Sequence, residues 1–215
     1  MEKRNRTVGI FGCGLLGQIV ARGIANGLVP GYRLAGVTDA NASLAQALSA
    51  KTGGAFCANL DELLLQRPDH LVEAAGGGAL KSAALSILQA GADLIPLSIG
   101  AFADEDFLRE VRRTAQENGV RVYLPSGAIG GFDLMRAASL HGRLQAAIAN
   151  DKPPRSLQEA VSYPLPEDRE EPLFSGSARE AIARFPKNVN VAVATALATN
   201  GPGETQVTVA SCPEL

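Results

Sequence analysis

Gly12-Cys13-Gly14-Leu15-Leu16-Gly17, a G-x-G-x-x-G segment, decides the fold of this chain. It stands between an apolar run, Val8–Phe11, and a stretch, Leu15–Ala25, whose apolar residues recur at helical spacing. Strand, tight turn and helix are therefore predicted. In such a turn the first glycine permits the bend, the second lets the backbone approach a pyrophosphate, and the third lets helix pack on strand. The expected cofactor contacts in this loop are Gly12, Gly14, Leu15, Leu16 and Gly17.

An acidic residue follows the loop where a dinucleotide site needs one. Asp39 comes just after a second apolar run, Arg33–Val37, about 20 residues beyond the loop, where a carboxylate accepts hydrogen bonds from the adenosine ribose. Its charge repels a 2′-phosphate and so favours NAD over NADP, although Thr38 and Asn41 leave room for NADP. The alternative is a glycine turn without a ligand and an exposed Asp at a strand end. The order of strand, glycine loop, helix and acidic residue favours a dinucleotide-binding site over this alternative.

Short apolar strands and helices alternate along the first part of the chain. Beyond the second strand, helices are predicted at Ser43–Ala50, Leu80–Ala90 and Asp104–Asn118, and strands at Leu71–Ala75, Leu94–Ile99 and Val120–Leu124. Parallel strands need crossover connections, which the helices supply. The alternation predicts an α/β fold of Rossmann type, a doubly wound parallel sheet with helices on both faces.

A change of composition marks a second domain. Asp151–Pro154 contains two prolines that cannot continue a helix, and the acidic, proline-rich segment Pro164–Pro172 is typical of an exposed loop. Beyond it, helices are predicted at Ser177–Arg184 and Val189–Thr199 and a strand at Thr205–Val209. We therefore expect a dinucleotide-binding domain over residues 1–127 and a smaller α+β domain over residues 128–215.

Composition and charge narrow the classes of function. The chain has 215 residues, 46% hydrophobic and 20% charged, enough for one substantial core and a smaller lobe. Its net charge of -2 gives no basic field for a nucleic-acid backbone, and no apolar run is long enough for a signal peptide or a membrane span. Cys13, Cys57 and Cys212 lie too far apart for a disulfide framework or a zinc site. A cytoplasmic protein without metal, nucleic-acid or membrane partner is expected.

Four later segments carry the most specific motifs. Pro125–Gly131 reads P-S-G-A-I-G-G and Phe185–Ala192 reads F-P-K-N-V-N-V-A, and Ser98–Ala101 and Phe174–Ala181 accompany them. In order and approximate spacing these segments resemble the L-aspartate dehydrogenase family. The resemblance implies an NAD(P)-dependent enzyme that oxidises L-aspartate to iminoaspartate, which hydrolyses to oxaloacetate and ammonia or feeds NAD biosynthesis. It also implies a homodimer whose second domain forms the substrate cleft.

The resemblance extends to single residues. It places cofactor contacts of the family on Ala128 and Asn190, and we expect Ser126 and Asn188 to bind substrate. Asn188 and Asn190 stand near the start of a predicted helix, whose N-terminal amides attract an anion. The alternative is that both asparagines merely cap or solvate that helix.

The end of the sequence departs from the family's pattern. Where the family has Asp-Pro and, soon afterwards, its catalytic histidine, this sequence has Cys212-Pro213 and then Leu215. We therefore expect the catalytic histidine beyond Leu215, weak or undetectable aspartate turnover by these 215 residues, a second domain incomplete at its C-terminus, and an unpaired edge on the sheet that begins with the strand at Thr205–Val209. His70 is expected in a surface loop or at a strand end, and His141 on a helix and partly buried.

Three functions therefore remain open from sequence. The first is L-aspartate dehydrogenase activity. The second is a non-catalytic NAD(P)-binding sensor or scaffold. The third is a related amino-acid or imine oxidoreductase, against which the F-P-K-N-V-N-V-A string argues.

Overall fold

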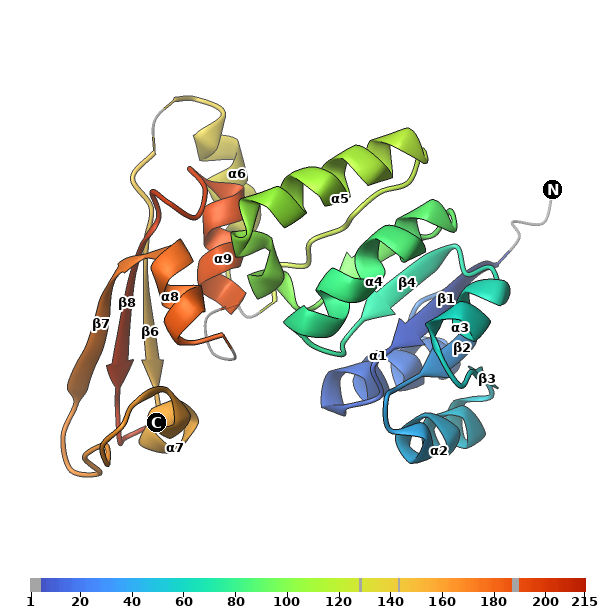
Figure 1. The fold of residues 1–215 in the computed structure, drawn as a ribbon, viewed down its shortest axis with the longest axis horizontal. Helices are drawn as coiled ribbons and strands as arrows, with labels where there is room; N and C mark the ends of the chain where they lie inside the picture. The colour runs from blue at the N-terminus through green and yellow to red at the C-terminus, as the bar shows by residue number, and fades with distance from the viewer. Residues whose placement is uncertain (1–4, 128, 143, 187–189) are drawn as a thin grey trace. The chain divides into compact units, whose positions relative to one another are not determined.

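The computed structural model describes residues 5–127, 129–142, 144–186 and 190–215. The chain forms two compact units (Figure 1). The first unit comprises residues 1–101 and 106–125, and the second comprises residues 102–105 and 126–215.

A parallel sheet forms the centre of the first unit. Its strands are β1 (Arg6–Phe11), β2 (Tyr32–Thr38), β3 (Ala55–Phe56), β4 (His70–Glu73) and β5 (Asp93–Pro96). They lie in the order β3-β2-β1-β4-β5, and every neighbouring pair is parallel. The strand order reverses between β1 and β4, and at such a point the carboxyl ends of the strands border a crevice in which ligands bind. The predicted Rossmann-type sheet is confirmed.

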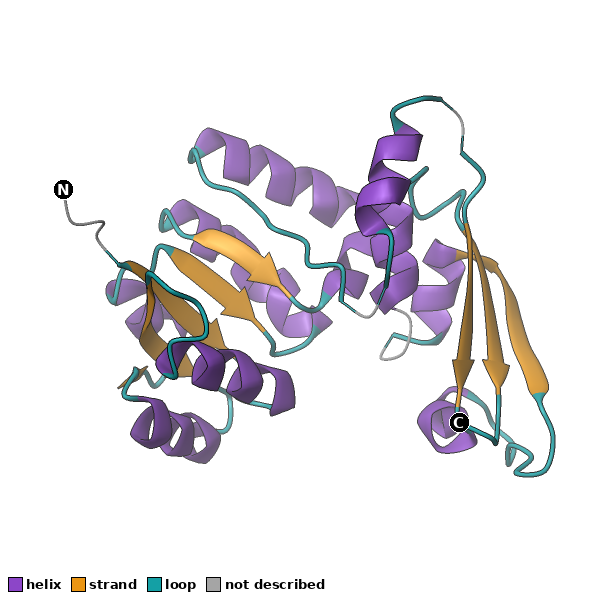
Figure 2. Cartoon of the chain, turned by 180° about the vertical axis from the view of Figure 1, so that it is seen from behind, coloured by secondary structure: helices purple, strands orange, loops and turns teal. Residues whose placement is uncertain are grey.

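Helices connect these strands. They are α1 (Leu15–Ala25), α2 (Ala42–Thr52), α3 (Leu60–Leu65), α4 (Gly77–Gln89) and α5 (Glu105–Glu117), with a 3-10 turn at Ile99–Ala103. Ala21 and Ile24 of α1 pack with Val37 and Val72 in one buried cluster, because the apolar side of the helix faces the sheet. Seen from behind, helices lie in front of part of the sheet (Figure 2).

The fifth strand predicted at Val120–Leu124 is wrong in extent. Only a single bridge, Leu94 to Val122, joins this segment to β5. The backbone N–H of Arg121 donates instead to the Asp93 carboxylate at 2.8 Å, and Pro125 has no N–H to give. The segment therefore adds one bridge to the edge of the sheet and does not form a full strand.

A three-stranded sheet and four helices form the second unit. The strands are β6 (Ala147–Lys152), β7 (Glu171–Ser177) and β8 (Gln206–Ser211), and the helices are α6 (Phe132–Ser139), α7 (Pro154–Leu157), α8 (Ala178–Arg184) and α9 (Asn190–Ala198). The order is β6-β8-β7, with β8 parallel to β6 and antiparallel to β7. The strand predicted at Thr205–Val209 is β8, which lies at the centre and is paired on both sides, so β6 and β7 are the edges of this sheet among the described strands.

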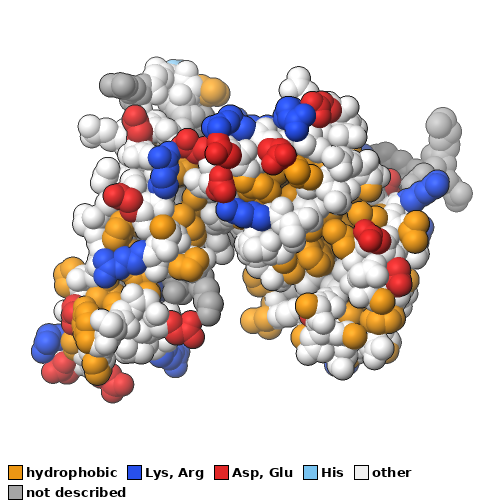
Figure 3. All heavy atoms as spheres, in the orientation of Figure 1, with side chains coloured by type: hydrophobic (Ala, Val, Ile, Leu, Met, Phe, Trp, Pro, Cys, Tyr) orange, Lys and Arg blue, Asp and Glu red, His pale blue; other side chains and the backbone are white. Residues whose placement is uncertain are grey.

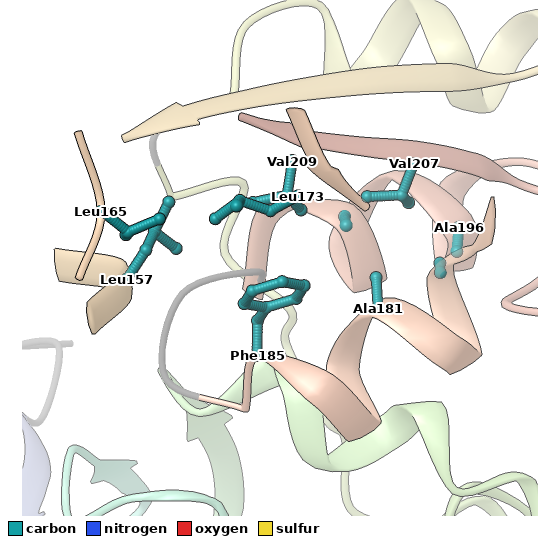
Figure 4. Close-up of a cluster of buried hydrophobic side chains, with 10 residues drawn as sticks. Leu157, Leu165, Leu173, Ala181, Phe185, Ala196, Val207 and Val209 are labelled. Carbon is teal, nitrogen blue, oxygen red and sulfur yellow. The ribbon is translucent and has the colours of Figure 1, made fainter. Parts of the chain in front are cut away.

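Apolar side chains between this sheet and its helices make the second core (Figure 4). Val207 and Val209 of β8 lie over Phe185, which is fully buried. The Phe185 ring meets the Phe174 ring edge-on at a centroid distance of 6.0 Å. Leu165 is also buried, so Pro164–Pro172 is not wholly the exposed loop that its composition predicts.

The start of α8 explains part of the Phe174–Ala181 motif. Ser177 and Glu180 form a capping box, in which both the backbone N–H and the hydroxyl of Ser177 donate to the Glu180 carboxylate, at 2.8 and 2.7 Å. These hydrogen bonds lower the pKa of Glu180. A Cβ at Gly176 would stand 2.8 Å from the Phe174 ring and 2.9 Å from Glu180 Oε2, so glycine makes room for both. The motif therefore builds a helix start.

Two further features of the molecule are the charge on its surface and the length of its helices. On the face drawn in Figure 3, basic and acidic side chains are interspersed. Within the described part of the chain, no helix combines the length and the apolar character needed to cross a membrane.

Candidate functional site

The glycine loop joins β1 to α1 at the carboxyl edge of the parallel sheet. Gly12 has a φ of +104°, and a Cβ there would lie 2.5 Å from the backbone carbon of Ala74. A Cβ at Gly17 would lie 1.9 Å from the carbonyl oxygen of Gly12. Strand, loop and helix are thus packed so closely that the first and third positions have no room for a side chain.

Gly14 is different, because it faces open space. A Cβ at this position would meet nothing within 4 Å, and its φ of -67° suits any residue. Gly14 is the N-cap of α1, and no side chain caps that helix end. The first amides of α1 are therefore open to an anion, as in pyrophosphate-binding loops. Leu15 and Leu16 are exposed beside this opening, at 77% and 56%.

Asp39 lies directly after β2 and is half-buried. Its Oδ2 accepts a hydrogen bond from the Cys13 N–H at 2.6 Å, and its Oδ1 accepts one from the Asn41 N–H at 2.7 Å. The carboxylate therefore fixes the glycine loop, a role that the sequence interpretation did not include. Each carboxylate oxygen has two acceptor positions, so both can also accept from ribose hydroxyls.

Cys13 sits at the base of the loop with no exposed surface. Burial, and then the nearby Asp39 charge, raise the pKa of its thiol to about 12. The thiol is 3.5 Å from the carbonyl oxygen of Thr38, as a weak donor. Cys13 is therefore a neutral packing residue rather than a nucleophile.

Glu73 is a residue that the sequence interpretation missed. It ends β4, is fully buried, and accepts hydrogen bonds through Oε1 from the N–H groups of Ala75 and Gly76 at 2.7 and 2.8 Å. Ser98 donates to the same carboxylate through its hydroxyl at 2.8 Å and through its N–H at 3.2 Å. The signal was a charged residue at the end of an apolar strand, just before the Gly76–Gly78 cluster.

The other predicted site residues belong to the second unit or lie outside the described residues. Ser126 is half-buried, and Asn190 is the exposed first residue of α9. Ala128 and Asn188 lie outside the described residues. The structure thus brings the glycine loop and Asp39 together in the first unit.

His70 lies at a strand end, one of its two predicted places, but it is buried rather than at the surface, and the prediction for His141 is wrong. His70 is the first residue of β4 and only 5% exposed, because Arg6 and Asp93 flank its ring with closest approaches of 3.4 Å each. It lines an apolar cavity of about 660 Å³ in the first unit. His141 is exposed in the turn after α6. The register pairs Val8 with His70 and Phe11 with Glu73, so His70 lies at the strand end opposite the glycine loop.

Over the described ranges, no group of three or more His, Cys, Asp or Glu side chains is placed to hold a metal ion.

Comparison with family models divides the chain into two matches. A model described as "Homoserine dehydrogenase, NAD binding domain" matches residues 12–125, and one described as "Aspartate dehydrogenase, C-terminal" matches residues 133–215. The L-aspartate dehydrogenase of Methanocaldococcus jannaschii is 34% identical over 202 residues, which cover 92% of this chain and 75% of that protein. L-aspartate dehydrogenase 1 of Bordetella pertussis is 39% identical over 208 residues, covering 96% of this chain and 77% of that protein.

Solved structures give the same picture. The crystal structure of aspartate dehydrogenase from Thermotoga maritima superposes with a TM-score of 0.73 at 28% identity, covering 98% of this chain and 80% of that chain. The WlbA dehydrogenase of Bordetella pertussis, solved with NADH and UDP-GlcNAcA, has a TM-score of 0.59 at 16% identity over 98% of this chain and 72% of that chain. The second likeness concerns the fold alone.

Proposed function

Because this chain belongs to the L-aspartate dehydrogenase family, we propose that it oxidises L-aspartate with NAD(P) as the hydride acceptor. The family favours this activity over a non-catalytic nucleotide sensor and over a different amino-acid or imine oxidoreductase. The product, iminoaspartate, supplies NAD biosynthesis or hydrolyses to oxaloacetate and ammonia.

One observation carries the cofactor assignment. The backbone at Gly14 is open while Gly12 and Gly17 are closed to any side chain, which is the division of roles that a pyrophosphate-binding loop requires. Asp39 lies beside this loop and has acceptor positions for the adenosine ribose. We therefore assign NAD as the preferred cofactor, with NADP as the alternative.

The reaction is a balanced two-electron oxidation. A bound NAD would supply the acceptor for the hydride that leaves Cα of L-aspartate. The amino group loses a proton to solvent as the C=N bond forms, and water then replaces the imine nitrogen to release ammonia. The chain's own contribution is orientation of the two reactants. Gly12, Gly14, Leu15, Leu16 and Gly17 would hold the pyrophosphate side, and Asp39 the ribose. The residues proposed around the reacting groups are Ala128 and Asn190 for the cofactor and Ser126 and Asn188 for the substrate.

A steady-state assay tests the activity. The 215-residue chain is mixed with NAD and L-aspartate, and NADH is followed by its absorbance while oxaloacetate and ammonia are measured separately. NADH that forms with L-aspartate should be matched by equal amounts of oxaloacetate and ammonia, and none should form with D-aspartate. NADH formed without oxaloacetate and ammonia, or formed equally from D-aspartate, would contradict the proposal.

Replacing Asp39 tests the cofactor preference. In Asp39→Ser the 2′-phosphate of NADP no longer meets a carboxylate, so the ratio of the NADP dissociation constant to the NAD dissociation constant should fall by about tenfold or more. Affinity for both cofactors should also decrease, because the Cys13 and Asn41 amides lose their acceptor. Because the lost hydrogen bonds weaken both cofactors, the ratio of the two dissociation constants reports the effect of the Asp39 charge. A parent chain that already binds NADP more tightly than NAD would refute the role of Asp39 in cofactor choice.

Two wider expectations stay predictions. The family resemblance predicts a homodimer, which sedimentation of the purified chain would test against a monomer. The composition predicts a cytoplasmic location, which fractionation of the source cells would test.

A further inference from the structure

A buried carboxylate lies at the centre of the loops that follow β4 and β5. Glu73 is 0% exposed, and it accepts hydrogen bonds from the N–H groups of Ala75, Gly76 and Ser98 and from the Ser98 hydroxyl. Such charge-assisted bonds are stronger than neutral ones. Burial of this carboxylate costs free energy, because the charge loses its hydration. We therefore expect its hydrogen bonds to serve a local role, which is to order these loops.

Three segments of the crevice depend on this one side chain. Glu73 binds the loop at Ala75 and Gly76 and the loop at Ser98 directly. The third segment is the glycine loop, because the backbone of Ala74 and Ala75 is what a Cβ at Gly12 would strike, at 2.5 and 2.6 Å. Gly76 is also the N-cap of α4, so the carboxylate sets where that helix begins.

The strand order places these loops in one half of the crevice. A dinucleotide spans the point where the order reverses, which here lies between β1 and β4. Asp39 follows β2 and marks the adenosine half. The loops after β4 and β5 therefore border the other half, where the nicotinamide nucleoside belongs.

We propose that Glu73 is a positioning residue that shapes the nicotinamide half of the cofactor site. It acts through the Ala74–Gly76 and Ser98 loops and does not itself bind the cofactor. The inference rests on the proposed function, since it assumes that the crevice takes a dinucleotide.

The near-isosteric variant Glu73→Gln removes the negative charge and one of the two acceptor oxygens to which these loops donate. Oε1 accepts three of the four hydrogen bonds and Oε2 accepts the fourth, from the Ser98 N–H. A glutamine has one acceptor oxygen, and its NH2 group would face at least one N–H donor. The loop arrangement then loses both the charge and one bond, while side-chain volume is kept.

The test compares a whole dinucleotide with its adenosine half. Dissociation constants are measured for NADH by its fluorescence and for ADP by calorimetry. In Glu73→Gln the NADH constant should rise on the order of tenfold, as expected for a lost charge-assisted hydrogen bond, and the ADP constant should change less than about twofold. Glu110→Gln, an exposed carboxylate on α5, is the matched control and should change neither constant.

A second variant keeps the inference testable if Glu73→Gln does not fold. Ser98→Ala deletes only the hydroxyl that donates to Glu73 at 2.8 Å, and it should weaken NADH several-fold, about as one neutral hydrogen bond would, with ADP unaffected. Unchanged NADH binding in the folded variants, or equal weakening of NADH and ADP, would overturn the positioning role. A parent chain that binds neither probe would instead remove the proposed function.

Discussion

The three glycines of the loop differ in what a methyl group would meet, and this difference is testable. Gly14→Val should fold, because a Cβ there meets nothing within 4 Å. It should lose NAD binding, since the side chain occupies the space of the pyrophosphate. Thermal unfolding with and without NAD measures both properties. An NAD dissociation constant unchanged by calorimetry would show that the cofactor does not use this loop.

Gly17→Ala is the matched control with the opposite expectation. Its Cβ would stand 1.9 Å from the Gly12 carbonyl oxygen, so the helix must shift away from the strand. The free energy of unfolding should fall by about 1 to 3 kcal/mol even without cofactor. Equal losses of unfolding free energy in Gly14→Val and Gly17→Ala would contradict the difference in space that the structure shows around the two glycines.

Cys13 gives a pH-dependent prediction at the same scale. Its pKa rises from about 9 to about 12 on folding, so between these values the folded chain keeps a proton that the unfolded chain releases. The stabilisation is complete below pH 9 and is lost as pH rises toward 12. The free energy of unfolding should fall with a slope approaching about 1.4 kcal/mol per pH unit from this residue.

Urea unfolding of the parent and of Cys13→Ala at several pH values from 8 to about 11 measures that slope. Lysine, tyrosine and the other thiols titrate in both proteins, so their contributions cancel in the difference. The variant should show the shallower decline. Parallel curves for the two proteins would mean that the buried thiol does not govern this pH range.

At the scale of elements, local pattern predicted the structure best where one side of a helix is apolar. The prediction Leu15–Ala25 coincides with α1, and Asp104–Asn118 differs from α5 by one residue at each end. β6 was missed, since Asn150 is its one buried residue and Ala147–Lys152 has no alternating apolar pattern. That strand exists because β8 pairs with it over six residues, which no local signal contains.

The capping box of α8 supplies a prediction for a single element. Ser177→Ala removes the side-chain oxygen that accepts from the Glu180 N–H and donates to the Glu180 carboxylate. The expected loss is about 1 kcal/mol of unfolding free energy, the usual cost of losing an N-cap. Urea denaturation measures it. Ser82→Ala, an exposed serine within α4, is the control and should cost less than half as much. Equal losses of unfolding free energy in Ser177→Ala and Ser82→Ala would show that the capping box does not stabilise α8.

At the scale of the whole molecule, the candidate site was predictable in part. The glycine loop and Asp39 fall within one strand-helix-strand segment, so their spacing alone indicated their proximity. Glu73 ends β4 and Ser98 follows β5, and only the pairing of these two strands brings the residues together. From periodicity alone, Glu73 is one charged residue in an apolar strand, and its hydrogen-bond partners cannot be inferred.

The central claim is that this chain moves hydride from Cα of L-aspartate to a nicotinamide held at the carboxyl edge of its parallel sheet. The most direct measurement uses L-aspartate deuterated at Cα, with NAD and the 215-residue chain, and analyses the nicotinamide product by mass spectrometry. The account predicts NADH that carries the deuterium at C4 of the ring, and none from the Gly14→Val chain. NADH formed from this substrate without deuterium would contradict it.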